Sequence, residues 1–302
     1  MNECCAILVN YNGYNDTIEC IESIEKSSIL VDVIIVDNAS AGNEYDMLIE
    51  KYALYKNVHV IRSSENRGFS AGNNIGIKYA MENGYEYIVL LNNDTVVEAN
   101  MFESLISNAK DNIVTTPLMY YYSNPKCIWF GGGRISRLTG NGHSINKGLI
   151  DNGNIYKDIM QCTFATGCCL AIKTSVFNQI GLLDETYFMY CEDTDFCIRL
   201  QQANIKINLV PTAKLWHKVS QSTGGEHSPF SIYYITRNRL HYVKKYRRFL
   251  GYTAYIISII TRLIRYIQYL FRNNELAYYM KLAIKDHFNN VTGQVKLERN
   301  DT

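Results

Sequence analysis

The sequence predicts an α/β fold with a mostly parallel central sheet, followed by a helical C-terminal extension. Three observations predict it. Short apolar β-branched runs alternate with helical patterns in the first half, polar residues follow several of these runs, and the last part of the chain is basic and aromatic. Strand–helix alternation is typical of parallel sheets with helices on both faces. We expect residues 1–227 to form the main domain and residues 228–302 the extension.

The elements follow from hydrophobic spacing and turn signals. The strands expected in the first half are Cys5–Asn10, Val33–Asp37, Val58–Arg62, Tyr87–Asn92 and Ile113–Thr116. Helical patterns lie between them at Asn15–Ser27, Glu44–Leu54, Ala71–Glu82 and Glu98–Asn108. Residues 117–165 are expected to form long loops with short strands. Later strands are expected near Phe164–Ile172, Ile205–Val210 and Ala213–His217, and a helix within Met189–Gln202.

Composition supports a folded protein, because 47% of the 302 residues are hydrophobic. Nine cysteines without a zinc-like CxxC pair predict buried, reduced thiols in the cytosol. No signal peptide is expected at the N-terminus. Residues 1–236 carry 17 Lys/Arg and 25 Asp/Glu, whereas residues 237–302 carry 13 and 4. A basic tail of this kind predicts contact with an anionic surface, either phospholipid or nucleic acid.

The segment Tyr252–Phe271 is apolar, but Arg262 and Arg265 interrupt it, which disfavours a membrane-spanning helix. Five apolar residues fall on one helical face: Ile256, Ile260, Leu263, Ile267 and Leu270. This pattern predicts an amphipathic helix in the membrane interface, and the basic run 244–248 supports it. The alternative is a helix docked on the protein body.

Polar residues at the strand ends are the first candidate site, because ligands of parallel sheets bind there. Asp37 suits hydrogen bonds to a ribose or a base, or it belongs to a turn that caps the next helix. Asn92-Asn93-Asp94 suits a divalent cation on a diphosphate, or it is a turn signal. In Asn66–Asn74, Gly68 and the helix start offer backbone N–H groups, and Arg67 offers a guanidinium for phosphate. The alternative is an ordinary glycine-rich loop.

An acidic helix start at Glu192-Asp193-Thr194-Asp195 is the strongest local signal. Glu192 and Asp193 are candidates for a general base, whereas Asp195 is expected to face inward or to cap. The alternative is simple complementation of the helix dipole. His217, at a strand end, is either a metal ligand or structural. Arg237 either binds a diphosphate or belongs to a solvated basic face.

Together these segments resemble the inverting family 2 glycosyltransferases of bacteria, close to those that build O-antigens, capsules and cell-wall glycans. The matching segments between about residues 5 and 245 are 9–13, 36–40, 66–74, 90–95, 130–132, 166–167, 181–185, 188–196, 216–217 and 233–238. The resemblance implies a GT-A-type catalytic domain. It also implies an enzyme that moves a sugar, with rhamnose or a galactose-type sugar favoured, from a UDP- or dTDP-sugar to a glycan hydroxyl.

The resemblance implies a role for each matched residue. The residues expected to contact the nucleotide and the donor are Asn10, Tyr11, Asn12, Asp37, Asn66, Arg67, Gly68, Asn73, Asn92 and Asn93. Asp94 and His217 would hold Mg²⁺ or Mn²⁺, and Asp193 would be the catalytic base. Glu192, Arg237 and Asn238 would lie near the acceptor or the diphosphate. One departure is Asn92, which stands where the family often has a metal-binding Asp, so metal binding is expected to be weaker.

The expected partners are the nucleotide sugar, a glycan or lipid-linked acceptor and an anionic membrane surface, with no nucleic acid. The expected location is the cytoplasm, on the inner face of the cell membrane. A nucleotidyltransferase is the first rival, but it would need a glycine-rich basic loop after the first strand, where this chain has Asn10–Asn15. A non-catalytic scaffold that binds nucleotide sugars and docks on the membrane is the second. Asp94, Asp193 and His217 argue against it.

Overall fold

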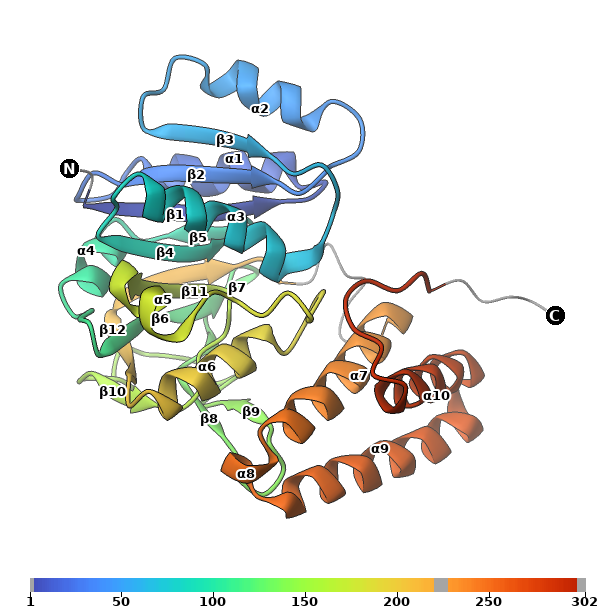
Figure 1. The fold of residues 1–302 in the computed structure, drawn as a ribbon. Helices are drawn as coiled ribbons and strands as arrows, with labels where there is room; N and C mark the ends of the chain where they lie inside the picture. Colours follow the sequence, from blue (N-terminus) through green and yellow to red (C-terminus); the bar gives the residue numbers. More distant parts are fainter. Residues whose placement is uncertain (1–2, 220–227, 298–302) are drawn as a thin grey trace.

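The computed structural model describes residues 3–219 and 228–297, and it has the expected mixed α/β architecture (Figure 1). The first half contains β1 (Cys4–Asn10), α1 (Tyr14–Ile24), β2 (Asp32–Asp37), α2 (Glu44–Tyr52), β3 (Val58–Arg62), α3 (Gly68–Glu82), β4 (Tyr87–Asn92), β5 (Thr95–Val97) and α4 (Met101–Ile106). The second half of the main domain contains β6 (Ile113–Tyr121), β7 (Asn124–Phe130), β8 (Gly133–Ile135), β9 (Gly142–Ser144), β10 (Met160–Cys162), β11 (Cys169–Lys173), α5 (Thr174–Ile180), α6 (Glu192–Gln202) and β12 (Lys206–His217).

The central sheet has the strand order β10-β12-β6-β11-β4-β1-β2-β3, with β5 on β12 and β7 on β6. Strands β4, β1, β2 and β3 are parallel, whereas β11 runs antiparallel between β4 and β6. In the register, Asn10 lies opposite Asp37, and Val9 lies opposite Asn92. The polar strand ends predicted from the sequence therefore meet at one edge of the sheet.

Helix α3 packs unusually close to the sheet because it carries glycine where other helices carry side chains. A Cβ on Gly76 would lie 2.5 Å from Ile7 Cγ2, and one on Gly72 would lie 2.8 Å from Val9 Cγ1. In Figure 1, α3 crosses in front of β1 and β2, and α1 lies behind them. The close approach places the N-terminal end of α3 beside the carboxyl ends of the parallel strands.

Four expected strands differ from the structure. Within the predicted strand Phe164–Ile172, only the residues from Cys169 onward are in β11, because the preceding residues turn to α6, where the Gly167 amide donates to Asp193. The two strands expected at Ile205–Val210 and Ala213–His217 are one strand, β12, with a register shift between Val210 and Lys214. The strand from Ile113 extends to Tyr121 and forms a hairpin with β7.

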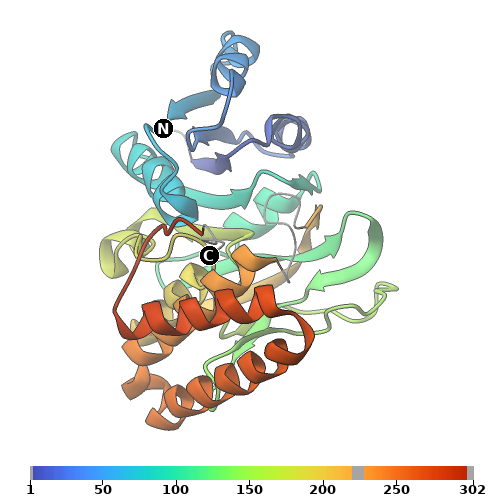
Figure 2. The ribbon, with the colours of Figure 1, turned by 90° about the vertical axis from the view of Figure 1, so that its right-hand side faces the viewer.

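The C-terminal region is helical, as predicted: α7 (Pro229–Lys245), α8 (Arg247–Leu250), α9 (Tyr252–Arg272) and α10 (Asn274–Phe288). It packs against the segment around α6 (Figures 1 and 2). One hydrophobic cluster joins Tyr187 and Ile198 to Tyr242 and Val243, and a second joins Phe188 to Tyr233. The boundary predicted after residue 227 lies at the edge of segment 220–227, which is outside the described residues.

Helix α9 contacts the rest of the described chain along one narrow side, where Ala254, Ser258 and Arg262 are buried. The face that carries Ile256, Ile260 and Ile267 is exposed. The helix is therefore docked on the described protein body, as the alternative expected, although its apolar face stays exposed. No helix of residues 3–219 and 228–297 has the length and apolarity needed to cross a membrane. All nine cysteines are free thiols, and seven are buried.

Candidate active site

The Asn10 side chain organises the ends of β1 and β2. Its Nδ2 donates to Asp37 Oδ2 and to Ser40 Oγ, each at 3.0 Å, and to Glu44 Oε2 at 3.1 Å. Asp37 is fully buried and also accepts from the Ser40 amide at 3.2 Å. Asn12 has a φ of 53°, and its side chain accepts from the Ala41 amide. This network fixes Asp37 at the base of the expected nucleotide site, beside the half-exposed ring of Tyr11.

The segment from Asn66 shapes the start of α3. Asn66 Oδ1 accepts from the Gly68 amide at 2.9 Å and from Asn38 Nδ2 at 3.0 Å. Gly68 has a φ of +89°, and a Cβ there would lie 1.9 Å from the Phe188 carbonyl oxygen. Gly68 therefore brings the backbone close to the segment before α6. Asn73 is buried and donates to the Phe69 carbonyl, so it shapes the helix from within.

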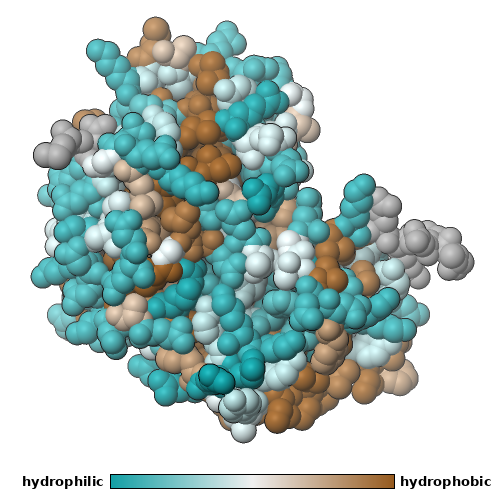
Figure 3. Space-filling model, in the orientation of Figure 1, coloured by the Kyte–Doolittle hydropathy of each residue, from teal (hydrophilic) through white to brown (hydrophobic). Residues whose placement is uncertain are grey.

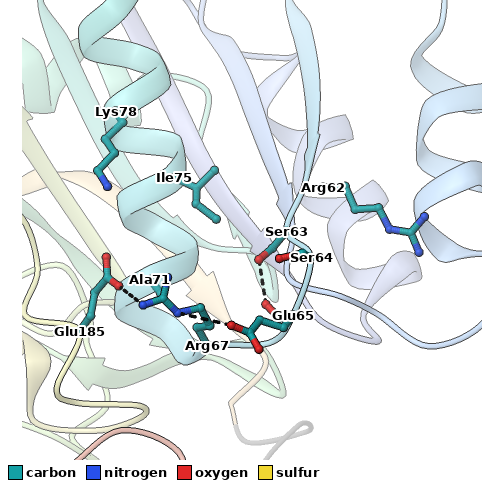
Figure 4. Close-up of a pocket in the computed structure, with 9 residues that line it drawn as sticks. All are labelled: Arg62, Ser63, Ser64, Glu65, Arg67, Ala71, Ile75, Lys78 and Glu185. Atoms are coloured by element: carbon teal, nitrogen blue, oxygen red, sulfur yellow. Dashed lines mark hydrogen bonds and ion pairs between the residues drawn. The ribbon is translucent and has the colours of Figure 1, made fainter.

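Arg67 is largely exposed and pairs with Glu185, with 3.0 Å between Nη2 and Oε2. Both residues line a pocket of about 430 Å³ beside α3, together with Arg62, Glu65 and Lys78 (Figure 4). Figure 4 shows the Arg67 guanidinium between the two glutamates. The pocket lies on the outer side of α3, and its lining includes none of the carboxylates expected to act in catalysis. Of the expected donor residues, only Arg67 lines it.

Asp94 and His217 come together as predicted, at the turn between β4 and β5. His217 pairs with Thr95 across the β12–β5 ladder, and its Nε2 lies 3.0 Å from Asp94 Oδ1. Asn93 donates to Thr17 Oγ1 at 2.8 Å. The buried Oδ1 of Asn92 has no hydrogen-bond partner. The sheet itself thus sets the distance between the two candidate metal ligands.

These donors fit a divalent cation of the Mg²⁺ or Mn²⁺ type. A carboxylate oxygen and an imidazole nitrogen converge, and a diphosphate and water would complete the oxygen-rich coordination such ions prefer. The unpartnered Oδ1 of Asn92 is a further acceptor at the same strand end. Among residues 3–219 and 228–297, no group of three or more His, Cys, Asp or Glu side chains forms a complete metal site.

Asp193 sits in the first turn of α6 and is held by hydrogen bonds. Its Oδ2 accepts from the Gly167 amide at 3.3 Å, and its Oδ1 accepts from the Thr194 amide at 2.6 Å and from the Thr194 hydroxyl at 3.2 Å. Next to Gly167, the Cys168 carbonyl accepts from the Asn92 amide. This chain of contacts links the acidic helix start to the strand end that carries Asp94.

Burial shifts the titration of both carboxyl groups at the helix start. Desolvation, followed by the charge of Asp193, raises the pKa of Glu192 to about 8. Desolvation also raises the pKa of Asp193, and its hydrogen bonds from Gly167 and Thr194 oppose the shift. One Glu192 oxygen is buried without a partner. The hydrogen bonds to Asp193 favour its ionised form, and Glu192 has no comparable support at its buried oxygen.

The loop before α6 is strained and held from α7. Tyr190 and Cys191 have φ values of 68° and 74°, in the left-handed region that non-glycine residues seldom adopt. Asn238 Nδ2 donates to the Met189 carbonyl at 2.8 Å and to the Tyr190 carbonyl at 3.1 Å. Asn238 was expected near the acceptor, and the structure places it as a positioning residue for this loop.

Two other charged residues expected at or near the site point into the fold. Asp195 is fully buried and bonds Arg199, Lys245 and Tyr246, which joins α6 to α7 and confirms that it faces inward. Arg237 is fully buried, and its Nη2 donates to the Gly293 carbonyl at 2.8 Å. Its guanidinium has no exposed surface, so we correct the expectation of a direct diphosphate contact or a solvated basic face. The cause is packing between α7 and the chain after α10.

Sequence reasoning missed several polar residues that support the site. Asn74 exchanges hydrogen bonds with the Leu183 backbone and donates to Glu185, which fixes the loop before α6. Ser40 bonds Asn10 and the Asn12 amide. Both lie in segments that the sequence analysis matched, 66–74 and 36–40, but neither was given a role of its own.

A family model described as "Glycosyl transferase family 2" matches residues 5–181. The chain belongs to glycosyltransferase family 2. This glycosyltransferase is 25% identical over 253 residues to the low-salt glycan biosynthesis hexosyltransferase Agl10 of Haloferax volcanii, which covers 79% of this chain and 75% of that one. It is 25% identical over 250 residues to the dTDP-rhamnosyl transferase RfbF of Shigella flexneri, which covers 80% and 79%.

The fold of this glycosyltransferase is of the predicted GT-A type. The structure aligns with the crystal structure of GalNAc-T7 with UDP, GalNAc and Mn²⁺ with a TM-score of 0.69 and 17% identity. The alignment covers 96% of this chain, and the chain spans 58% of the GalNAc-T7 chain. At this identity the likeness shows the fold alone.

Proposed function

We propose that this glycosyltransferase moves rhamnose or a galactose-type sugar from a UDP- or dTDP-sugar to a hydroxyl of a lipid-linked glycan, with inversion at the anomeric carbon. The observation that carries the proposal is the position of the Asp193 carboxylate. Hydrogen bonds from Gly167 and Thr194 hold it at the start of α6. The neighbouring Cys168 carbonyl accepts from the Asn92 amide, which links this helix start to the strand end that carries Asp94. The similarity to a hexosyltransferase and to a dTDP-rhamnosyl transferase supports the sugar class.

In the proposed reaction, Asp193 takes the proton of the acceptor hydroxyl. The acceptor oxygen forms a bond to the anomeric carbon from the face opposite the diphosphate. The bond between that carbon and the phosphate oxygen breaks, the nucleoside diphosphate leaves, and the anomeric configuration inverts. Asp37, buried under Asn10 and Ser40, positions the strand ends beside which the nucleotide would bind. A divalent cation held by Asp94 and His217 would stabilise negative charge on the diphosphate.

The proposed site of action is the inner face of the cell membrane. The exposed face of α9 carries Ile256, Ile260, Ile267 and Phe271, and Arg265 and Arg272 are exposed on the same helix. Figure 3 shows the corresponding hydrophobic patch over the lower C-terminal helices. A helix with one exposed apolar face and flanking basic residues suits an anionic bilayer surface. An acceptor anchored in that bilayer would lie close to the enzyme.

A donor screen tests the proposal. The full chain is incubated with UDP- and dTDP-sugars and with Mg²⁺ or Mn²⁺, and nucleotide release and thermal shift are measured. We expect one donor to give a metal-dependent response that Asp94→Asn and His217→Ala weaken. A folded sample that responds to no donor, with anionic vesicles present, would contradict catalysis and favour the scaffold alternative.

A further inference from the structure

Two arginines, the buried Arg262 and the half-buried Arg239, lie between α7, α9 and the loop that joins β8 to β9, and neither has a carboxylate partner among residues 3–219 and 228–297. Arg262 is 6% exposed, and its Nε has no hydrogen-bond partner. Arg239 donates from Nη2 to the Thr139 carbonyl at 3.1 Å, and its Nε is also buried without a partner. Among the described residues, the charged groups that act on the two guanidinium groups are other arginines, with no carboxylate among them. Burial raises the pKa of the neighbouring Tyr242 and Cys191, so both are neutral.

The cluster is electrostatically unfavourable as it stands. Burial, then the charges of Arg239 and Arg265, lower the pKa of Arg262 to about 10. Burial also lowers the pKa of Arg239. Buried charges without a counterion cost free energy, and natural folds seldom keep them without a use. Arg265, one turn after Arg262, is exposed and extends the cluster to the surface. The missing counterion is therefore an anion that enters from the Arg265 side.

The cluster adjoins the catalytic loop. Cys191 is within electrostatic range of Arg239 and Arg262, and it directly precedes Glu192 and Asp193. The β8–β9 loop is tied over the cluster, because Ser258 Oγ and Arg239 both donate to the Thr139 carbonyl. The cluster thus lies between the proposed base and the helix with the exposed apolar face.

We propose that Arg239, Arg262 and Arg265 bind a phosphate or diphosphate group of the acceptor. Guanidinium groups match phosphate oxygens with paired hydrogen bonds, and several arginines together suit a multiply charged group. The proposal rests on the proposed function, and it names the acceptor as a phosphorylated, lipid-anchored glycan. The donor diphosphate has its own proposed site at Asp94 and His217, so the arginine cluster serves the second substrate.

Inorganic pyrophosphate is the probe that tests the cluster, added to the full chain without divalent cations. We expect pyrophosphate to raise the Tm of the wild type, of Asp94→Asn and of Arg272→Gln, an exposed control on the same helix. Arg262→Met should bind pyrophosphate at least about tenfold more weakly. Without the anion, Arg262→Met should melt at or above the wild-type Tm, because it removes an unpaired buried charge. Arg265→Gln, on the surface, should weaken binding without any effect on folding.

Three results would overturn the proposal. The first is loss of the pyrophosphate response in Asp94→Asn but not in Arg262→Met or Arg265→Gln, which would place the anion at the donor site. The second is a lower Tm of Arg262→Met together with full binding in Arg265→Gln, which would make the cluster structural. The third is an unchanged pyrophosphate response in Arg262→Met together with lost binding to phosphatidylglycerol vesicles, which would assign the cluster to lipid headgroups. No donor is present, so a failed donor screen would leave this test unaffected.

Discussion

Asp193 and Glu192 are neighbours in sequence, yet they differ in how their charges are supported. Three hydrogen bonds reach the Asp193 carboxylate, whereas one buried oxygen of Glu192 receives none. Two carboxyl groups in one low-dielectric site divide the proton between them according to such differences. The hydrogen bonds from Gly167 and Thr194 favour the ionised form of Asp193, which is the form that a general base needs.

Substitution of Asp193 by Asn should abolish the general base while keeping the shape of the side chain. We expect Asp193→Asn to bind the donor normally and to lose at least about a hundredfold in kcat. Steady-state kinetics and donor thermal shift measure the two effects separately. Asp158→Asn, on an exposed loop residue, is the control with the same chemical change. A kcat of Asp193→Asn near that of the wild type would refute the assignment.

The raised pKa of Glu192 predicts a pH dependence of stability. The folded protein holds this proton more tightly than the unfolded chain, so stability falls as pH rises from the ordinary value of 4.5 to about 8. Glu192→Gln cannot ionise and should escape this loss. By pH 8 its Tm should exceed the wild-type Tm by at least about 4 °C more than at pH 5. Parallel Tm curves for the two proteins would show that burial does not perturb Glu192.

Helix α3 lies close to the sheet because Gly72 and Gly76 have no side chains where it faces β1. Gly76→Ala would place a methyl group 2.5 Å from Ile7 Cγ2, and the resulting overpacking should cost about 1–3 kcal/mol of unfolding free energy. Chemical denaturation measures this cost. Ile7→Ala opens space at the same contact, so the two substitutions together should cost less than their sum. Additive effects would mean that the helix moves away without resistance.

The strands β1 to β4 could be predicted from the sequence because each is a local apolar run between turn signals. The antiparallel β11 was predicted too long, because the contact between Gly167 and Asp193 that turns the chain away joins residues far apart in sequence. The continuity of β12 and the β6–β7 hairpin likewise depend on partners that no local pattern encodes.

In the candidate site too, some residues carry local sequence signals, and other features depend on contacts between distant parts of the chain. Asp37, Asp94 and Asp193 carry local signals at strand ends and at a helix start, and His217 lies where its strand ends. The approach of His217 to Asp94 depends on the pairing of β12 with β5. Arg237 shows the limit of such reasoning, because its charge suggested a ligand contact and packing buried it completely.

For the whole molecule, the exposed face of α9 predicts membrane binding. The triple substitution of Ile260, Leu263 and Ile267 by Gln should remove most binding to anionic vesicles in a flotation assay. Donor hydrolysis in solution should not change, because these side chains are exposed and contact no site residue. A stable dimer in solution that the same substitutions disrupt would instead identify the face as a contact between two copies.

The matched control changes three exposed leucines on the main domain, Leu30, Leu54 and Leu149, to Gln. It removes more exposed apolar surface than the α9 variant does, but from other places. Vesicle binding should remain at the wild-type level in this control. Equal losses in both triple variants would mean that general hydrophobicity, and not α9, governs the flotation result.

Asn238 has a consequence for how this enzyme can be divided and recombined. Its two hydrogen bonds run from α7 to the strained backbone just before the proposed base. A shortened chain that stops after β12 would keep every expected donor-site and metal-site residue, yet its acidic loop would lack this brace. The C-terminal helices therefore cannot be exchanged independently of the catalytic domain. Chimeras between family members should exchange α6 and α7 as one unit, and lineages that diverged in one should have diverged in the other.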